Sequence, residues 1–127
     1  MKELHVVAAI IKKDNKILTT QRGYGEFKGQ WEFPGGKIKE NETKEEALIR
    51  EIKEELNADI KIDKFIIDVE YQYPEFYLYM SCYLCTAKTS IELLEHMNAK
   101  WLNKDELDSV NWLPADIKVI EYLKKII

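Results

Sequence analysis

The stretch from Gly36 to Ala58 reads GKIKENETKEEALIREIKEELNA, and it is the most informative part of the chain. A glycine pair leads into a segment in which an arginine, Arg50, is followed by Glu51, Glu54 and Glu55. Residues i, i+3 and i+4 share one face of an α-helix, so these three glutamates are expected to lie together. Like charges at this spacing repel each other and destabilise an isolated helix. The pattern therefore predicts a positive partner between them, and a divalent cation is the first candidate.

A helix rich in glutamate and lysine is more often a solvated surface than a metal site, and only the exact spacing argues otherwise here. Gly36 is followed after five residues by Glu42, and after seven more by a run that starts at Arg50. This pattern resembles the Nudix box, Gly-x5-Glu-x7-Arg-Glu-U-x-Glu-Glu-x-Gly-U, where U is a bulky aliphatic residue. Every charged position matches. Asn57 replaces the last glycine and Ala58 the last aliphatic residue, and asparagine tolerates the left-handed conformation common at helix ends.

The box itself predicts a helix from about Lys44 to Leu56. Thr43 is a suitable N-cap, and Glu46 follows it by three residues, as in a capping box. One side of this helix is apolar and is expected to pack on a sheet, so that the glutamates lie at the rim of that contact. The residues of this apolar stripe are Leu48, Ile49, Ile52 and Leu56.

The rest of the chain alternates between extended segments and turns. Pro34-Gly35-Gly36 is expected to break an extended piece, and residues 23 to 30 form a loop rich in glycine. Strands before, between and after two helices predict an α/β fold with a mixed sheet and helices on both faces, and the Nudix resemblance implies an α/β/α sandwich in a single domain, residues 1–127. The expected strands are 6–11, 17–21, 31–33, 60–70, 76–87 and 100–102, with turns at 12–16 and 103–106. The second expected helix is 115–127, with core positions Ile117, Val119, Ile120, Leu123 and Ile126.

The bulk composition is that of an ordinary globular protein. The chain has 127 residues, of which 46% are hydrophobic and 33% charged, and its net charge is −4. This charge argues against a protein that coats nucleic acid polymers. No apolar run approaches the length of a membrane span and the N-terminus has no signal-peptide pattern, so we expect a cytoplasmic protein without a membrane partner. Cys82 and Cys85 lack a second pair to complete a zinc site, and we expect both to be reduced and structural.

The resemblance implies a metal centre for hydrolysing a diphosphate linkage. Glu51, Glu54 and Glu55 would supply ligands to Mg²⁺, with Mn²⁺ as an alternative, because these ions prefer carboxylate oxygens and substrate phosphates. Gly35 would offer its backbone carbonyl to the same ion. Arg50 would orient the glutamates by ion pairing.

The general base is the least certain part of this implied site. Glu54, Glu55 or a carboxylate outside the box would fit the role. Glu95, in Leu94-Glu95-His96, stands where MutT-like members carry a further metal-binding or base carboxylate, although a solvated loop residue is an equal alternative. His96 is expected to be structural, and Glu42 is expected to support the geometry of the loop and helix.

Two segments outside the box point to a nucleotide. The run from Trp31 to Ile38, WEFPGGKI, closely resembles the MutT branch, the pyrophosphohydrolases that clean nucleotide pools. Arg22 stands where that branch contacts nucleotide phosphate, with a solvent-exposed arginine as the alternative. Phe33 is a candidate for stacking on the base, although ordinary packing explains it as well.

The base itself is expected to be read by Asp116, in the turn Leu113-Pro114-Ala115-Asp116 that opens the last helix. An ionised aspartate only accepts hydrogen bonds, which suits the exocyclic amine of cytosine. The segment resembles MutT-like cytidine-triphosphate pyrophosphohydrolases, whereas 8-oxoguanine-specific members carry asparagine at this position. An aspartate protonated in a dry pocket, a contact to guanine and a plain N-cap of a helix starting at Ile117 are the alternatives.

The leading hypothesis is an Mg²⁺-dependent enzyme that converts a (d)NTP to (d)NMP and pyrophosphate, with cytosine nucleotides ahead of oxidised guanine nucleotides. A hydrolase of ADP-ribose or of a dinucleoside polyphosphate is the second, because Pro74 lies sixteen residues past Ala58, a spacing seen in ADP-ribose hydrolases. A nucleotide sensor without activity is the third, although this chain keeps all the box glutamates. The expected partner is a small nucleotide, and the protein is expected to be a monomer or a homodimer.

Overall fold

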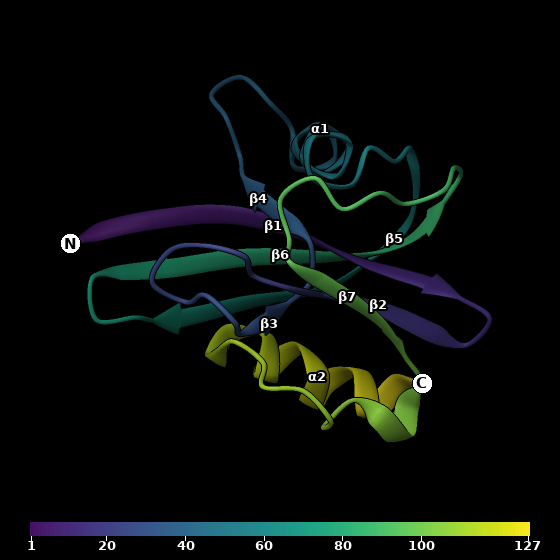
Figure 1. Cartoon of the computed structure of the whole chain (residues 1–127). Helices are drawn as coiled ribbons and strands as arrows, with labels where there is room; N and C mark the ends of the chain where they lie inside the picture. The colour runs from purple at the N-terminus through teal and green to yellow at the C-terminus, as the bar shows by residue number, and fades with distance from the viewer.

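The computed structural model describes all 127 residues and places two helices on opposite sides of one mixed sheet (Figure 1). This arrangement confirms the predicted α/β architecture. The helices are α1 (Lys44–Leu56) and α2 (Pro114–Ile126), with a short 3₁₀ turn η1 (Lys104–Glu106). The strands are β1 (Lys2–Lys13), β2 (Lys16–Gln21), β3 (Trp31–Glu32), β4 (Gly35–Lys37), β5 (Ile60–Gln72), β6 (Phe76–Ala87) and β7 (Asn98–Leu102).

Strand β1 is the centre of the sheet, whose main order is β3-β2-β1-β6-β5. β1 runs parallel to β6 along most of its length and antiparallel to β2 and β4, which pair with different parts of it. β7 pairs with β2 antiparallel. The sheet is therefore mixed, and the box strand β4 is hydrogen-bonded directly to the buried central strand.

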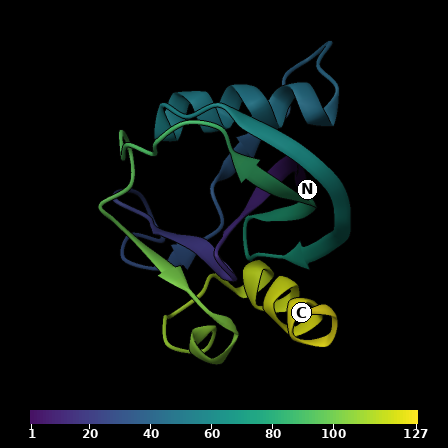
Figure 2. The same cartoon turned by 90° about the vertical axis from the view of Figure 1, so that its right-hand side faces the viewer.

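The alternation of side chains along β1 divides the core into two halves. Successive residues of a strand point to opposite faces, so Val7, Ala9 and Ile11 pack under α1, whereas Ala8 and Ile10 pack over α2. Figure 2 shows the two helices above and below the strands. The two cysteines follow the same rule, since Cys82 lies in the α2 half and Cys85 in the α1 half, and both thiols are free.

Helix α1 begins and ends at the predicted residues. Thr43 and Glu46 form the predicted capping box, and Asn57 closes the helix in the left-handed region with φ 48°. One member of the predicted stripe is wrong: Ile49 is 46% exposed, and Ala47 is buried instead. Only Leu48, Ile52 and Leu56 of the four lie on the arc that faces the sheet, because this narrow face covers about a third of the helix circumference.

Other predictions need correction where tertiary contacts decide the local structure. Gly35 and Gly36 do not break the chain but form β4, because their backbone pairs with Ala8 and Val7 of β1. A Cβ atom at Gly35 would clash with the Val7 carbonyl oxygen, so this close pairing requires glycine. The predicted turn at 12–16 is reduced to Asp14-Asn15, both with positive φ, which is a tight hairpin turn. The predicted turn at 103–106 contains the η1 helix.

Helix α2 differs from the prediction at both its start and its buried face. It starts at Pro114 with Leu113 as the N-cap residue, so Asp116 lies inside the first turn and does not cap the helix. Ile117 and Ile126 were expected in the core but are 44% and 45% exposed. The buried face consists of Ala115, Asp116, Val119, Ile120 and Leu123. Neither helix is long and apolar enough to cross a membrane.

Candidate active site

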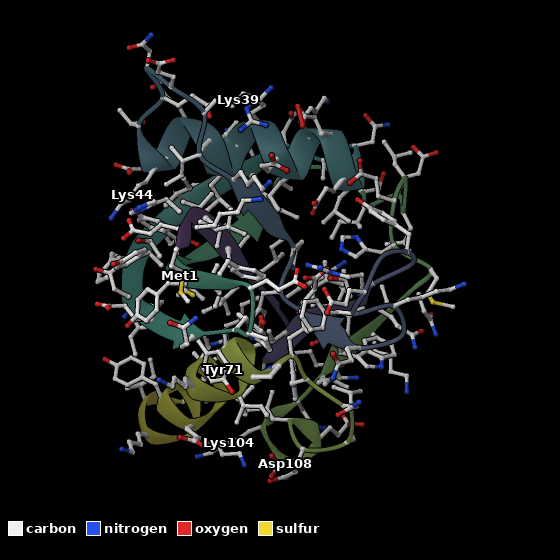
Figure 3. All side chains as sticks on the ribbon, turned by 90° about the vertical axis from the view of Figure 1, so that its left-hand side faces the viewer. Met1, Lys39, Lys44, Tyr71, Lys104 and Asp108 are labelled. Atoms are coloured by element: carbon white, nitrogen blue, oxygen red, sulfur yellow. The ribbon has the colours of Figure 1, made fainter.

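A cleft of about 690 Å³ runs from the glutamate face of α1, past the glycines of β4, to the start of α2. Figure 3 shows Lys39, which contributes to the lining of the cleft, on the α1 side of the molecule, and Tyr71 on the α2 side. The cleft joins carboxylates at one end to apolar and aromatic side chains at the other. The residues from the sequence prediction that line it are Arg22, Phe33, Gly35, Glu51, Glu54, Glu55, Glu95 and Asp116.

Arg50 is the positive partner that the glutamates of α1 require. Its Nε and Nη2 atoms donate to the two carboxylate oxygens of Glu42 at 2.6 and 2.9 Å, and Nη1 donates to Glu51 at 2.8 Å and to Glu54 at 3.1 Å. Nη2 also donates to the Lys37 carbonyl at 3.0 Å. Hydrogen bonding to Arg50 lowers the pKa of Glu42 to about 2. The guanidinium therefore ties the helix to the loop that precedes it, as expected for Arg50 and Glu42.

Glu55 is the most desolvated of the three helix glutamates. Its Oε1 accepts a hydrogen bond from the Gly35 N–H at 3.2 Å, which fixes the carboxyl against β4. Burial, helped by the charges of Glu32, Glu51 and Glu95 and opposed by the Gly35 hydrogen bond, raises the pKa of Glu55 to about 9. A carboxyl held neutral by burial and by nearby carboxylates is a group that a cation would ionise.

The carboxylate oxygens of Glu51, Glu54 and Glu55 are of the kind that binds a hard divalent cation, although the three side chains do not point at one common position. No three acidic, histidine or cysteine side chains lie close enough together to hold an ion in the present arrangement, because Arg50 engages Glu51 and Glu54. A cradle for Glu51 is nevertheless built in: a Cβ atom at Gly36 would overlap the Glu51 carboxylate. Glu51, Glu54 and Glu55 all line the same cleft, and ligand sets made only of oxygen atoms suit Mg²⁺.

Glu95 lies in the segment between β6 and β7 and faces the same carboxylates. Its side chain is exposed and lines the cleft, and its charge acts on Glu55. The neighbouring His96 is buried, with only 5% of its side chain exposed, and its Nε2 lies 3.4 Å from Glu32. The structure thus places Glu95 at the cleft. His96 packs beside it and contacts Glu32, which is consistent with the structural role expected for His96.

Glu32 is the site residue that the sequence reasoning missed. It accepts hydrogen bonds from Arg22 Nη2 at 2.6 Å and Arg22 Nε at 3.2 Å, in addition to the contact with His96. Arg22 also lies 5.9 Å from the ring centroid of Phe27. Glu32 therefore holds the guanidinium at the cleft, while 37% of the Arg22 side chain stays exposed to solvent. The only available signal was a glutamate in an otherwise apolar run, Trp31-Glu32-Phe33. In the sheet Glu32 pairs with Thr20, and alternation places Arg22, two residues beyond Thr20, on the same face as Glu32.

Asp116 lies at the inner, apolar end of the cleft and is 4% exposed. Its Oδ1 accepts a hydrogen bond from the backbone N–H of Phe33 at 3.1 Å. Burial raises the pKa of Asp116 to about 8, so this carboxyl is mostly protonated at neutral pH, as one of the alternatives anticipated. The Phe33 ring is 4% exposed and packs 4.9 Å from Trp112, so Phe33 contributes mainly its backbone to the site.

Comparison with known proteins places this geometry in a known family. Residues 1–123 match the model of the NUDIX domain. The chain is 31% identical over 123 residues to the CTP pyrophosphohydrolase of Escherichia coli K12, covering 95% of this chain and 91% of the relative. It is 36% identical over 129 residues to the 8-oxo-dGTP diphosphatase of Buchnera aphidicola subsp. Schizaphis graminum, covering 100% and 98%. The solution structure of MutT from methicillin-resistant Staphylococcus aureus 252 has a TM-score of 0.78 and 41% identity, and the match covers 99% of each chain.

The family match and the named relatives define a hydrolase of phosphoric anhydride bonds, and carboxylates of one helix line its cleft. The chain belongs to the Nudix family, and its relatives place it in the MutT-like branch. Nudix hydrolases generally use divalent metals such as Mg²⁺. The protein is therefore a Nudix hydrolase that acts on nucleotides.

Proposed function

We propose that this enzyme is an Mg²⁺-dependent pyrophosphohydrolase that converts a (d)NTP and water to (d)NMP and pyrophosphate, with cytosine nucleotides as its preferred substrates. The observation that carries the proposal is the continuity of one cleft. The carboxylates of α1 lie at one end, Arg22 lies between, and a buried aspartate lies at the apolar end. A triphosphate at the α1 end and a base at the Asp116 end match this order of charged and apolar groups.

The metal would be held by Glu51, Glu54 and Glu55, with the Gly35 carbonyl as a further candidate ligand. A bound Mg²⁺ neutralises phosphate charge and lowers the pKa of a coordinated water. The chain's own contribution is to hold the carboxylates. Arg50 orients Glu51 and Glu54, and the Gly35 N–H orients Glu55. Glu54, Glu55 and Glu95 all face the cleft, and each remains a candidate to accept the proton of the attacking water.

Gly36→Ala is expected to leave the fold intact and to weaken metal binding. The added methyl group would occupy the space of the Glu51 carboxylate, which is the end of a flexible side chain and turns aside. We expect Mn²⁺ affinity, measured by calorimetry or electron paramagnetic resonance, to fall at least about tenfold, as for other changes that misplace a ligand. Unchanged Mn²⁺ affinity in a folded Gly36→Ala protein would remove Glu51 from the proposed ligand set.

The base is proposed to lie against aromatic side chains and to meet Asp116. Phe27, Tyr73 and Phe76 line the cleft near its apolar end, whereas the Phe33 ring is buried in the core. A neutral carboxyl both donates and accepts. Asp116 in this form would donate to N3 of cytosine and accept from its N4 amine, which is a matched pair of hydrogen bonds.

The names of the relatives support both a cytosine and an oxidised guanine substrate. The Escherichia coli relative is a CTP pyrophosphohydrolase and the Buchnera relative an 8-oxo-dGTP diphosphatase. A neutral Asp116 also suits the N7–H and O6 pair of 8-oxoguanine, so 8-oxo-dGTP is the second candidate. The cytosine proposal rests on Asp116 itself, which stands in a Leu-Pro-Ala-Asp turn like that of cytidine-triphosphate pyrophosphohydrolases, and on the similarity to the Escherichia coli CTP pyrophosphohydrolase.

A substrate panel tests the proposal directly. The purified protein is assayed with Mg²⁺ on CTP, 5-methyl-dCTP, 8-oxo-dGTP, dGTP and ADP-ribose, with release of nucleoside monophosphate and of pyrophosphate measured separately. We expect the highest kcat/KM for one of the two cytosine nucleotides and pyrophosphate as the second product. A preference for 8-oxo-dGTP would replace the cytosine assignment, and AMP release from ADP-ribose ahead of all triphosphates would overturn the triphosphate assignment.

The pH dependence of KM tests the role of Asp116. A carboxyl with a raised pKa keeps its proton to higher pH, so the Asp116 donor is present below pH 8 and is lost as the pH rises through about 8. We expect KM for CTP to rise about tenfold between pH 7 and pH 9, because one unit above the pKa only about a tenth of the carboxyl is protonated.

Asp116→Asn provides the matched comparison for this profile. Asparagine also donates and accepts but does not titrate, so its KM should stay nearly constant over the same range. The metal, the triphosphate and the other cleft groups titrate equally in both proteins. Parallel KM profiles for the wild type and Asp116→Asn would exclude Asp116 from base recognition.

A further inference from the structure

The segment that carries Glu95 is docked onto the end of the metal-site helix by backbone hydrogen bonds. We call residues 88–97, between β6 and β7, the strap. The Glu92 N–H donates to the Leu56 carbonyl at 2.8 Å, and the Leu94 N–H donates to the Glu55 carbonyl at 3.0 Å. These are carbonyls of the last turn of α1, which have no partner within the helix. The strap therefore closes the helix end and brings Glu95 next to Glu55.

Two hydrogen bonds that involve side chains join the strap to the residues that follow α1: the Asp59 N–H donates to Thr89 Oγ1 at 3.0 Å, and the Asn57 amide binds Glu92. Asn57 Nδ2 donates to Glu92 Oε1 at 2.9 Å. Asn57 stands where the Nudix box has glycine, and its left-handed conformation, with φ 48°, is one that asparagine shares with glycine. Substitution by asparagine thus preserves the backbone at this point and adds a donor that glycine lacks.

Ile91 is the apolar residue of the strap that packs against the core under α1, and the other large apolar side chains are mostly exposed, so hydrogen bonds supply much of the attachment. The side chains of Leu93, Leu94 and Met97 are 38%, 53% and 55% exposed. A segment with few buried apolar contacts opens at low free energy. The carboxylate of Glu92 also lies at the negative end of the α1 dipole, where an unpaired acid is unfavourable. The Asn57 amide offsets that repulsion.

The far end of the strap is attached to the opposite wall of the cleft. The Met97 N–H donates to the Gln21 carbonyl at 3.0 Å, and His96 contacts Glu32 at 3.4 Å. Glu95 therefore sits between an anchor on α1 and an anchor on β2 and β3. If the bonds to α1 loosen, the strap is held only at its start, where Lys88 and Thr89 bond to Asp59, and at its far end, so that Glu95 can move away from Glu55.

We propose that Asn57 is a positioning residue: by holding Glu92, its amide fixes the strap so that Glu95 is kept against the carboxylates of α1. The proposal rests on the proposed function in one respect, namely that Glu95 contributes to metal binding or turnover. Asn57 stands where the Nudix box has glycine, and the proposal gives this asparagine a role in holding Glu95 in place.

The test uses three variants at the anchor and one control. Asn57→Gly removes the donor and keeps the backbone conformation. Asn57→Asp places two carboxylates side by side, and Asn57→Asp combined with Glu92→Lys replaces the hydrogen bond by an ion pair of opposite polarity. Lys53→Ala is the control, because it removes a surface ion pair to the Asp59 side chain and leaves every hydrogen bond of the strap in place, including those that the Asp59 backbone makes with Lys88 and Thr89.

Two readouts are independent of catalysis. Hydrogen exchange reports the protection of the Leu94 amide, and Mn²⁺ titration followed by electron paramagnetic resonance reports metal affinity. We expect Leu94 exchange to be about tenfold faster in Asn57→Asp, which is the loss of one hydrogen bond to a charged group. We expect Mn²⁺ affinity and kcat of Asn57→Asp to fall about threefold to tenfold with KM unchanged. The double variant should restore the Leu94 exchange rate, the Mn²⁺ affinity and kcat.

The outcomes separate this inference from the proposed function. Wild-type Leu94 exchange in both Asn57→Gly and Asn57→Asp would overturn the inference, as would faster exchange with wild-type kcat and Mn²⁺ affinity. Effects of the same size in Lys53→Ala would also overturn it, since they would show a general effect of the helix end. A wild-type protein that cleaves none of the triphosphates would contradict the proposed function, and the exchange and Mn²⁺ readouts would still decide the role of Asn57.

Discussion

Glu54→Gln is expected to lower kcat by about a thousandfold without disturbing the fold, as for the loss of a carboxylate that binds the metal or accepts a proton. The side chain of Glu54 is 49% exposed, and its hydrogen bonds in the structure are to Arg50. Glutamine keeps the length and can still accept a bond from Arg50, but it has no charge to offer a cation. The change therefore removes chemistry and leaves packing as it was.

The measurement is kcat at saturating Mg²⁺ together with the melting temperature. Glu46→Gln is the matched control, because Glu46 lies on the same helix, makes its bond through a carboxylate oxygen that glutamine retains, and belongs to the N-terminal capping box away from the cleft. It should behave as the wild type. A Glu54→Gln enzyme with wild-type turnover would refute a role for Glu54 in the chemistry.

Arg50→Lys is expected to lower kcat about a hundredfold and to raise the Mg²⁺ concentration needed for half-maximal activity. Arg50 contacts three carboxylates and one carbonyl through three nitrogen atoms in a planar fork. A lysine ammonium is a single point donor and cannot reproduce the paired bonds to Glu42 while also reaching Glu51 and Glu54. The glutamates would then repel each other at helical spacing and lose their common orientation.

Activity as a function of Mg²⁺ concentration distinguishes this effect from simple unfolding. Excess Mg²⁺ should recover part of the lost activity, since the cation then supplies the missing positive charge. Glu42→Gln is the comparison, because it weakens one arm of the Arg50 network and leaves the charges of Glu51 and Glu54 in place; its loss should be smaller. Wild-type dependence on Mg²⁺ in a folded Arg50→Lys protein would contradict the orienting role.

The elements defined by local signals were predicted well. α1 begins and ends at the predicted residues because its cap, its capping-box glutamate and its left-handed closing asparagine are all near neighbours in sequence. β6 also has the predicted bounds, because Pro74 ends the preceding segment and a long run rich in aromatic and other apolar residues follows. The Nudix pattern belongs to the same group, since its residues lie on one helix and the loop before it.

The predictions that failed depended on contacts with segments that are distant in the sequence. The sequence does not show how wide a face of a helix the sheet covers. Ile49, Ile117 and Ile126 were therefore predicted in the core, although they lie at the edge of the covered face and are exposed. Gly35 and Gly36 were predicted to break the extended segment, because a glycine pair in the sequence does not indicate that it will pair with a distant strand such as β1. Their pairing with β1 is what places the Gly35 N–H on Glu55.

The sequence by itself determined the family, the carboxylate helix and the kind of bond that is hydrolysed, because these depend on residues within one local segment. Tertiary structure alone decided how the charges are balanced and where the apolar end of the cleft lies. Asp116 meets Phe33 across 83 residues of chain because the Leu113 N–H binds the Trp31 carbonyl and joins the start of α2 to β3. Glu32 likewise meets Arg22 and His96 only in the folded sheet. Burial sets the charge state of Asp116 and Glu55, and no local pattern of residues encodes burial.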